Sequence, residues 1–293
     1  DWSVRLDTAE AVPGVLVNQA VDAAARAPDE ATTYLLQLLR SPIAEARELE
    51  MAGDIARARL QHRDLAKKLY ARAIDVDPER ISAKAEYFAL LAEEYASRQS
   101  AKQELLELSR ANPSAQNVLG STLNVLLHND DYPTIKALAI ELLPISRCQA
   151  LLWRNLAVAH QQLEDPVEDV LAAFESSIAI ARGDESPLSF VNCARPYASY
   201  LADLGDMDKA FRIIEEAVVA APTEPNIHVV RGDLFRRVGD VKAAHICYTF
   251  AQQFAYGEVL GSINRKITEV QALERIAAVL PFLAEPTSAN GVG

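Results

Sequence analysis

The sequence is poor in the residues and runs that mark sheets, disulfide frameworks and membrane spans. Of its 293 residues, 6% are aromatic, 11 are glycine and 3 are cysteine. We find no run of 18 apolar residues, no secretory signal peptide and no convincing alternation of apolar with polar residues. The sequence therefore predicts a helical chain without membrane insertion, and we expect it in the cytoplasm.

The charge balance is acidic, with 41 acidic against 29 basic residues and a formal net charge of -12. No cluster of lysine and arginine forms the basic face that a nucleic-acid binder needs, so we expect no nucleic-acid partner. An acidic surface favours solubility and suits a basic partner. Cys148, Cys193 and Cys247 are far apart and lack ligand spacing, which indicates buried free thiols in a reducing compartment.

Motifs for catalysis and for cofactors are also missing from the sequence. There is no phosphate-binding loop, GxSxG elbow, HExxH pair or dinucleotide fingerprint. None of the five histidines pairs with another at metal spacing. We therefore predict no catalytic residue, no cofactor, no metal ion and no enzyme activity for this chain.

What the sequence does have is helical periodicity, nearly continuous from Val15 to Leu280 and interrupted by proline and by Gly/Asn/Asp breaks. The phrase "LGDMDKA" from Leu204 returns as "VGDVKAA" from Val238. Glycine can end a helix in a left-handed conformation, and the aspartate after it can cap the next helix. The pattern predicts stacked antiparallel helix pairs.

Two units carry a shared pattern of small and large residues at the spacing of these phrases. The first, Val191–Pro222, has Ala198, Leu201, Ala210, Ala217 and Pro222; the second, Pro225–Glu258, has Gly232, Phe235, Ala244, Tyr248 and Ala251. This pattern resembles the tetratricopeptide repeat, whose period of about 34 residues matches the distance between the phrases. The resemblance implies an all-α fold, a right-handed α-solenoid superhelix of antiparallel helix pairs. The sequence departs from the family pattern at Pro196, where we expect the first helix to start late or to kink.

The resemblance also suggests a layout for the whole chain. We expect an N-terminal helical pair or cap over residues 1–46 and about six helical hairpins over residues 47–258, the first beginning with a helix over Arg47–Leu60. A capping helix would follow over residues 259–281, and a disordered tail or linker over residues 282–293. Stacks of this kind need caps to cover their last apolar faces.

In the resembled family, the first helices of the pairs line a concave groove that binds a protein or peptide. Asparagine can pair with an extended peptide backbone, and arginine offers a fork for carboxylate or phosphate. Apolar groove positions would suit an amphipathic helix. The predicted groove residues are Asn155, Asn192, Asn226, Arg154, Arg195, Arg236, Gln161, Leu90, Val118 and Val125. The full set of residues that clamps a peptide carboxylate in some family members is not reproduced here.

Three functions fit these observations. The first is a scaffold or adaptor that binds a partner of unknown identity in the groove. The second is the substrate-recruiting region of a larger transferase, such as a protein glycosyltransferase, since a first residue other than Met is expected of an excised piece or a processed product. The third is a structural protein that self-associates through its terminal helices.

Overall fold

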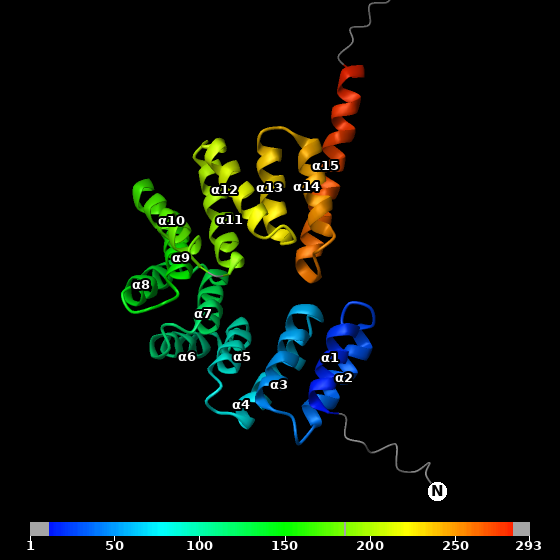
Figure 1. Cartoon of the computed structure of the whole chain (residues 1–293), viewed down its shortest axis with the longest axis vertical. Coiled ribbons are helices and arrows are strands. Elements are labelled where there is room, and N and C mark those ends of the chain that lie inside the picture. The colour runs from blue at the N-terminus through cyan, green and yellow to red at the C-terminus, as the bar shows by residue number, and fades with distance from the viewer. Residues whose placement is uncertain (1–11, 185, 284–293) are drawn as a thin grey trace, which may run out of the picture. The chain divides into compact units, whose positions relative to one another are not determined.

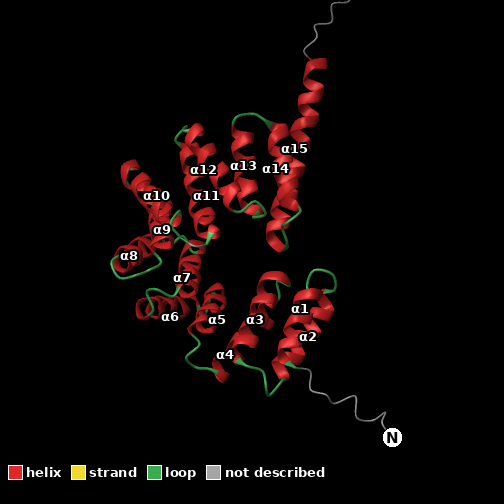
Figure 2. Cartoon of the chain, in the orientation of Figure 1, coloured by secondary structure: helices red, strands yellow, loops and turns green. Residues whose placement is uncertain are grey.

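The chain folds into helices joined by short connections. The structure, a computed structural model, describes residues 12–184 and 186–283. Within those residues every element of regular secondary structure is a helix, and loops and turns join the helices, as Figure 2 shows. The helices are α1 Pro13–Ala23, α2 Pro28–Arg40, α3 Ala46–Asp54, the π-helical turn η1 Ile55–Arg59, α4 Arg63–Val76, α5 Ile81–Glu93, α6 Arg98–Ala111, α7 Gln116–His128, α8 Tyr132–Leu142, α9 Gln149–Gln162, α10 Val167–Ala181, α11 Pro187–Asp203, α12 Met207–Ala220, α13 Pro225–Arg237, α14 Val241–Gln252 and α15 Gly257–Leu283.

Consecutive helices form antiparallel pairs, which confirms the all-α class and the helix-pair architecture expected from the sequence (Figure 1). The chain divides into two compact units, Asp1–Ala173 and Phe174–Gly293, with the boundary inside α10. In the first unit α1 packs on α2, α3 on α4, and α5 on α6; in the second, α11 packs on α12 and α13 on α14.

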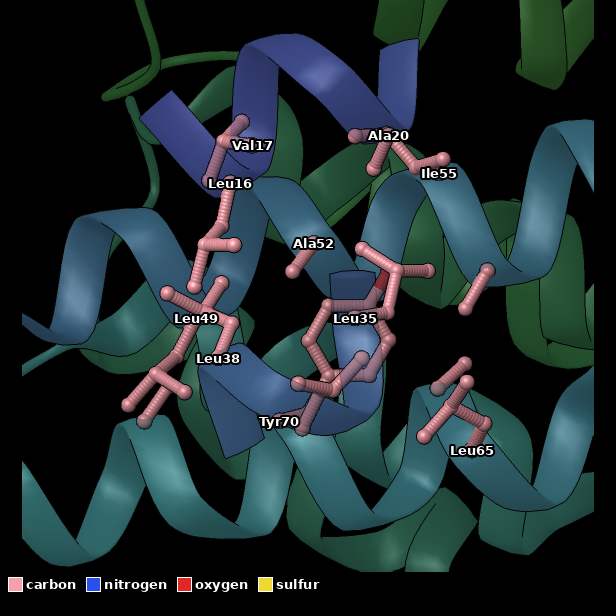
Figure 3. Packing of buried hydrophobic residues seen from close by; sticks show 14 of the residues in the cluster. Leu16, Val17, Ala20, Leu35, Leu38, Leu49, Ala52, Ile55, Leu65 and Tyr70 are labelled. Atoms are coloured by element: carbon pink, nitrogen blue, oxygen red, sulfur yellow. The ribbon is translucent and has the colours of Figure 1, made fainter. Parts of the chain in front are cut away.

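The core of the first unit shows why the pairs form. Leucines spaced three or four residues apart, such as Leu35 and Leu38, place one apolar stripe of each helix against its neighbours. Alanines such as Ala52 lie between these larger side chains and let the helix backbones approach closely. Figure 3 shows the stripe residues of α1 to α4 meeting around the ring of Tyr70, which is fully buried. Burial of these side chains is the main stabilising contribution.

The repeated turn has the conformation predicted from the phrase that begins at Leu204. Gly205 has φ +85°, and Asp206 then donates its backbone N–H to the carbonyl of Leu201 at 2.9 Å. The Asp206 carboxylate accepts the backbone N–H of Lys209 at 3.0 Å and so caps α12. Gly239–Asp240 repeats the same geometry before α14, so both predicted turns are confirmed.

The same turn occurs in the first unit without glycine. Gln61, Asp130 and Glu164 have φ of 54°, 52° and 55°, in the left-handed region that glycine occupies in the second unit. His62 and Asp131 follow two of these residues and cap the next helix with their side chains. These turns could not be recognised in the sequence by a glycine, because residues other than glycine occupy the left-handed position.

Ion pairs link one hairpin to the next in the first unit. Lys102 Nζ on α6 lies 2.6 Å from Asp131 Oδ2, and Lys136 Nζ on α8 lies 2.7 Å from Asp165 Oδ2. Asp165 also accepts a hydrogen bond from His160 at 2.6 Å. Lys136 and His160 hold the pKa of the Asp165 carboxyl below its ordinary value.

Three local features differ from the sequence expectations. The first helix of the Arg47–Leu60 segment is not continuous, because its last turn widens into η1. Pro196 lies inside α11 and does not delay its start, which leaves the carbonyl of the exposed Asn192 without its usual helical partner. The last helix is longer than the expected 259–281 and ends at Leu283; the rest of the expected tail lies outside the described residues.

Candidate functional site

The second unit contains a polar pocket on the first helices of its pairs. Its volume is about 200 Å³, and it lies between α11, α13 and α15. Helix α11 contributes one residue, α15 contributes one, and consecutive turns of α13 supply the rest. The lining residues are Ser199, Val230, Asp233, Leu234, Arg236, Arg237 and Lys266.

The two arginines at this pocket are paired with acids on the neighbouring first helices. Arg236 Nη1 lies 2.9 Å from Glu269 Oε2 on α15, and Arg237 Nη1 lies 2.6 Å from Asp203 Oδ1 on α11. All four side chains are between 40% and 60% exposed. Exposed pairs contribute at most about 1 kcal/mol each, so a charged partner can replace them at little cost.

The inner part of the pocket is held more firmly. Asp233 Oδ1 accepts the hydroxyl of Tyr248 at 2.7 Å and the ammonium of Lys266 at 2.6 Å. The Tyr248 ring is fully buried, and burial together with Asp233 raises the pKa of its hydroxyl. Asp233 therefore fixes the floor of the pocket, while Arg236 and Arg237 form its adjustable edge.

Arg195 has an unsatisfied donor in the second unit. It lies on α11 one turn before Ser199, which lines the pocket. The residue as a whole is half-buried, whereas its Nε is inaccessible and has no hydrogen-bond partner among the described residues. Burial lowers the pKa of its guanidinium, and the charge of Glu224 opposes that shift. Arginine stays charged in proteins, so this buried donor is costly to leave without an acceptor.

The two asparagines predicted in the second unit lie on α11 and at the start of α13. Asn192 is exposed one turn before Arg195 on α11. Asn226 is half-buried at the start of α13, where its Nδ2 donates to Glu224 Oε1 at 2.9 Å. Asn192, Asn226, Arg195 and Arg236 thus lie on the first helices of two successive pairs of one unit.

The polar residues predicted in the first unit are less accessible. Asn155 is 1% exposed; its Nδ2 donates to the carbonyl of Leu151 at 2.8 Å, while its Oδ1 has no partner in the described part of the chain. Arg154 and Gln161 are half-buried on the same helix, α9. A partner approaching this surface would meet Arg154 and Gln161 but little of Asn155.

The three apolar residues predicted for the groove lie in the core. Leu90 packs with α1 to α5, whereas Val118 and Val125 pack with α5 and α6, and their exposed fractions are 4%, 0% and 7%. All three residues belong to the hydrophobic stripe of their helix, and this stripe faces the neighbouring helices. They provide almost no accessible surface for a partner.

Sequence reasoning did not identify Lys266 and Glu269 as site residues. Both lie on α15, which was expected only to cover the last hairpin, yet α15 contributes to the pocket as the next first helix would. The signal was the spacing of Ile263, Ile267 and Val270, whose side chains pack against α14. Lys266 and Glu269 then form ion pairs with residues of α13.

A second pocket, of about 350 Å³, lies in the first unit between the connections that precede α3 and α5. Ile43 and Val76 are partly exposed at its edge. Two of its charged groups are already engaged: Glu45 caps α3 in a capping box, and Arg80 Nε lies 2.5 Å from Glu50 Oε2. No buried polar atom among its described lining residues lacks a partner, in contrast to the surface around Arg195.

The described residues offer neither a metal site nor a membrane span. Among residues 12–184 and 186–283, no group of three or more His, Cys, Asp or Glu side chains is placed to hold a metal ion. None of the helices in the same ranges is both long and apolar enough to cross a bilayer.

Solved structures share this arrangement of helix pairs over most of the chain. A tetratricopeptide repeat protein from Parabacteroides merdae matches with a TM-score of 0.58 and 16% identity, over 88% of this chain and 98% of that one. The fold is that of tetratricopeptide repeat proteins. No protein-family model matches the sequence, and no curated protein matches it.

Two larger proteins contain the same tetratricopeptide fold. A chain of the APC/C hetero-tetramer Cut9–Hcn1 matches with a TM-score of 0.54 and 12% identity over 88% of this chain, and yeast Tom70 with 0.50 and 16% over 91%. The matched regions span 46% and 48% of those chains, about half their length.

Proposed function

We propose that this chain binds a protein partner on the first-helix surface of its second unit, formed by α11, α13 and α15. The observation that carries the proposal is the polar pocket whose edge consists of two exposed, exchangeable ion pairs. A partner can replace Glu269 and Asp203 with its own acids and keep both arginines paired. The similar fold of a chain in the Cut9–Hcn1 hetero-tetramer supports a role of this chain in protein assembly.

We further infer that α3 to α14 act as six hairpins, with α1, α2 and α15 as caps. The turn geometry supports this count, because a left-handed residue followed by a capping side chain recurs in both units. The ion pairs of Lys102 and Lys136 connect successive hairpins in the first unit. The same binding surface would serve each of three functions. The chain could act as an adaptor, as the recruiting region of a larger transferase or as a self-assembling protein.

The test compares charge reversal on the pocket edge with charge reversal on the second helices. The variant Arg236→Glu/Arg237→Glu reverses both arginines, and Arg212→Glu/Lys242→Glu makes the same change on exposed residues of α12 and α14. A photo-crosslinking residue at Ser199 identifies what contacts the pocket.

We expect one protein to crosslink at Ser199 in the wild-type chain, to be lost with the edge variant and to remain with the control variant. A crosslinked second copy of this chain would select self-assembly, and a transferase or its substrate would select recruitment. Equal crosslinking by both variants would overturn the assignment of the surface.

A further inference from the structure

A row of exposed apolar side chains follows the outer face of α14 and continues past its end. Ile246, Phe250 and Phe254 come at intervals of four residues and are 71%, 38% and 38% exposed. Residues four apart form one ridge on the surface of a helix. We call these three side chains the α14 row.

The equivalent positions of the preceding second helix are not apolar. At a distance of 34 residues, the spacing of the two repeated turn phrases, α12 carries Arg212, Glu216 and Ala220, and all three are exposed. Arginine and glutamate are what a helix face open to water normally presents. An apolar row in the place of these charges therefore indicates an interaction surface.

Ring contacts hold two members of the α14 row in place. The centroids of the Phe250 and Phe254 rings lie 5.2 Å apart, and Phe250 also meets the ring of His228 in a T-shaped contact at 4.5 Å. His228 is buried, and its Nε2 lies 2.7 Å from the carbonyl oxygen of Pro222. Side chains that are ordered before contact lose less conformational entropy on binding, so the row is a preformed docking surface.

Opposite charges stand at the two ends of the row. Lys242 comes four residues before Ile246, and Glu258, in the first turn of α15, comes four residues after Phe254. Both are exposed, and neither forms an ion pair with a residue in the described part of the chain. No other lysine, arginine, aspartate or glutamate lies between them in the sequence. The surface thus runs from a cation through an apolar row to an anion.

We propose that the α14 row is the interface of a symmetric dimer, in which a second copy of this chain packs its own row antiparallel to the first. A two-fold axis beside Phe250 places Ile246 of each copy against Phe254 of the other. Lys242 of each copy then comes opposite Glu258 of the other at both ends of the interface. Rows of this spacing interdigitate in the most common class of helix packing.

The charge order is what selects a second copy as the occupant. An antiparallel copy supplies the complementary charge at both ends, whereas a parallel copy would set Lys242 against Lys242. Three apolar side chains per copy form a small interface, so we expect a dimer that exchanges with the monomer. This interface goes beyond the proposed function, because it uses a second helix and not the pocket on α11, α13 and α15.

The first test measures the mass of the full chain by sedimentation and light scattering at concentrations up to about 1 mM. We expect the wild-type mass to rise from the 32.0 kDa of the monomer toward twice that value. Ile246→Asp should weaken the dimer by at least about tenfold, because each dimer would bury two unpaired carboxylates. Ile140→Asp, at a 55% exposed isoleucine of α8, is the matched control and should dimerise as the wild type does.

The second test exchanges the charges at the ends of the row. Lys242→Glu and Glu258→Lys should each weaken the dimer, because each variant alone sets like charges opposite each other at both ends. A mixture of the two variants should dimerise again, since every end then joins a glutamate to a lysine. These differences should shrink at about 1 M salt, where the screening length falls to about 3 Å.

A constant monomer mass, growth beyond the dimer, or an Ile246→Asp chain that dimerises like the wild type would overturn the proposal. A mixture of the two charge variants that stays as weak as either alone would overturn it as well. Crosslinking at Ser199 is a separate readout and should persist in Ile246→Asp and in the control variant of the pocket test, which carries Lys242→Glu. A failed crosslink in a chain that still dimerises would remove the proposed function alone.

Discussion

Two glycines on first helices pack directly against a buried tyrosine of the second helix, and replacing them tests how rigid that contact is. A Cβ on Gly232 would lie 2.5 Å from Tyr248 Cε1, and a Cβ on Gly53 would lie 2.5 Å from Tyr70 Cε1. Both rings are fully buried. The hydroxyl of each ring is also fixed at 2.7 Å from an aspartate, so neither ring can move away easily.

The expected magnitude follows from two opposing effects. Replacing glycine by alanine inside a helix stabilises it by about 1 kcal/mol. Inserting a methyl group into a packed contact costs about 1–3 kcal/mol. At Gly261 on α15, where a Cβ meets nothing within 4 Å, only the first effect applies. We therefore expect Gly232→Ala to be less stable than Gly261→Ala by about 1–3 kcal/mol.

The assay is urea unfolding, monitored by hydrogen exchange with mass spectrometry. This readout distinguishes the stability of the α13–α14 hairpin from that of the rest of the chain. Gly53→Ala against Gly120→Ala makes the same comparison in the first unit, since a Cβ on Gly120 also meets nothing within 4 Å. Adding Tyr248→Leu to Gly232→Ala should recover part of the loss. If Gly232→Ala stabilises the hairpin as much as Gly261→Ala does, the tyrosine ring is not held and the reasoning fails.

Three further predictions concern the turns and the carboxylates beside them. Asp165 has a pKa lowered by Lys136 and His160 from its ordinary 3.8, so its contribution to stability is complete above that value and is lost as the pH falls through the lowered pKa. Urea midpoints measured from neutral to acid pH should therefore fall less steeply for Asp165→Asn than for the wild type, and equal slopes would contradict the shift. Gly239→Ala should destabilise α14 by about 1 kcal/mol, because alanine is strained at φ +84°, while Gly239→Asn should cost less; thermal melts of the two variants decide this. Asp240→Ala should cost about 1 kcal/mol through loss of the cap at the Ala243 N–H, and unchanged exchange of that amide would count against it.

The sequence was sufficient for the helix pairs because their signals are local. Apolar spacing locates each helix, and glycine followed by aspartate locates the turns at Gly205 and Gly239. The equivalent turns at Asp130 and Glu164 could not be located in this way. Their left-handed conformation is set by the packing of the helices on either side, which lets an ordinary residue take an unfavourable φ.

The accessible surface was harder to predict than the fold. One residue of error in helix register rotates a side chain by about 100°, enough to turn an exposed position into a buried one. Asn155 shows this sensitivity, since it was expected on the groove and is buried, whereas Asn192 on α11 is exposed.

Within the described part of each unit, every strong helix contact joins neighbours in the chain or helices two apart, such as α5 with α7 and α11 with α13. Tension applied to the ends of such a unit would meet no described helix that ties distant parts together. We expect the unit to unfold one hairpin at a time. Each step would release the length of one repeat and break one ion pair between hairpins, such as Lys102–Asp131. A partner bound across α11, α13 and α15 would join those steps, so that the chain yields at a higher force when it is occupied.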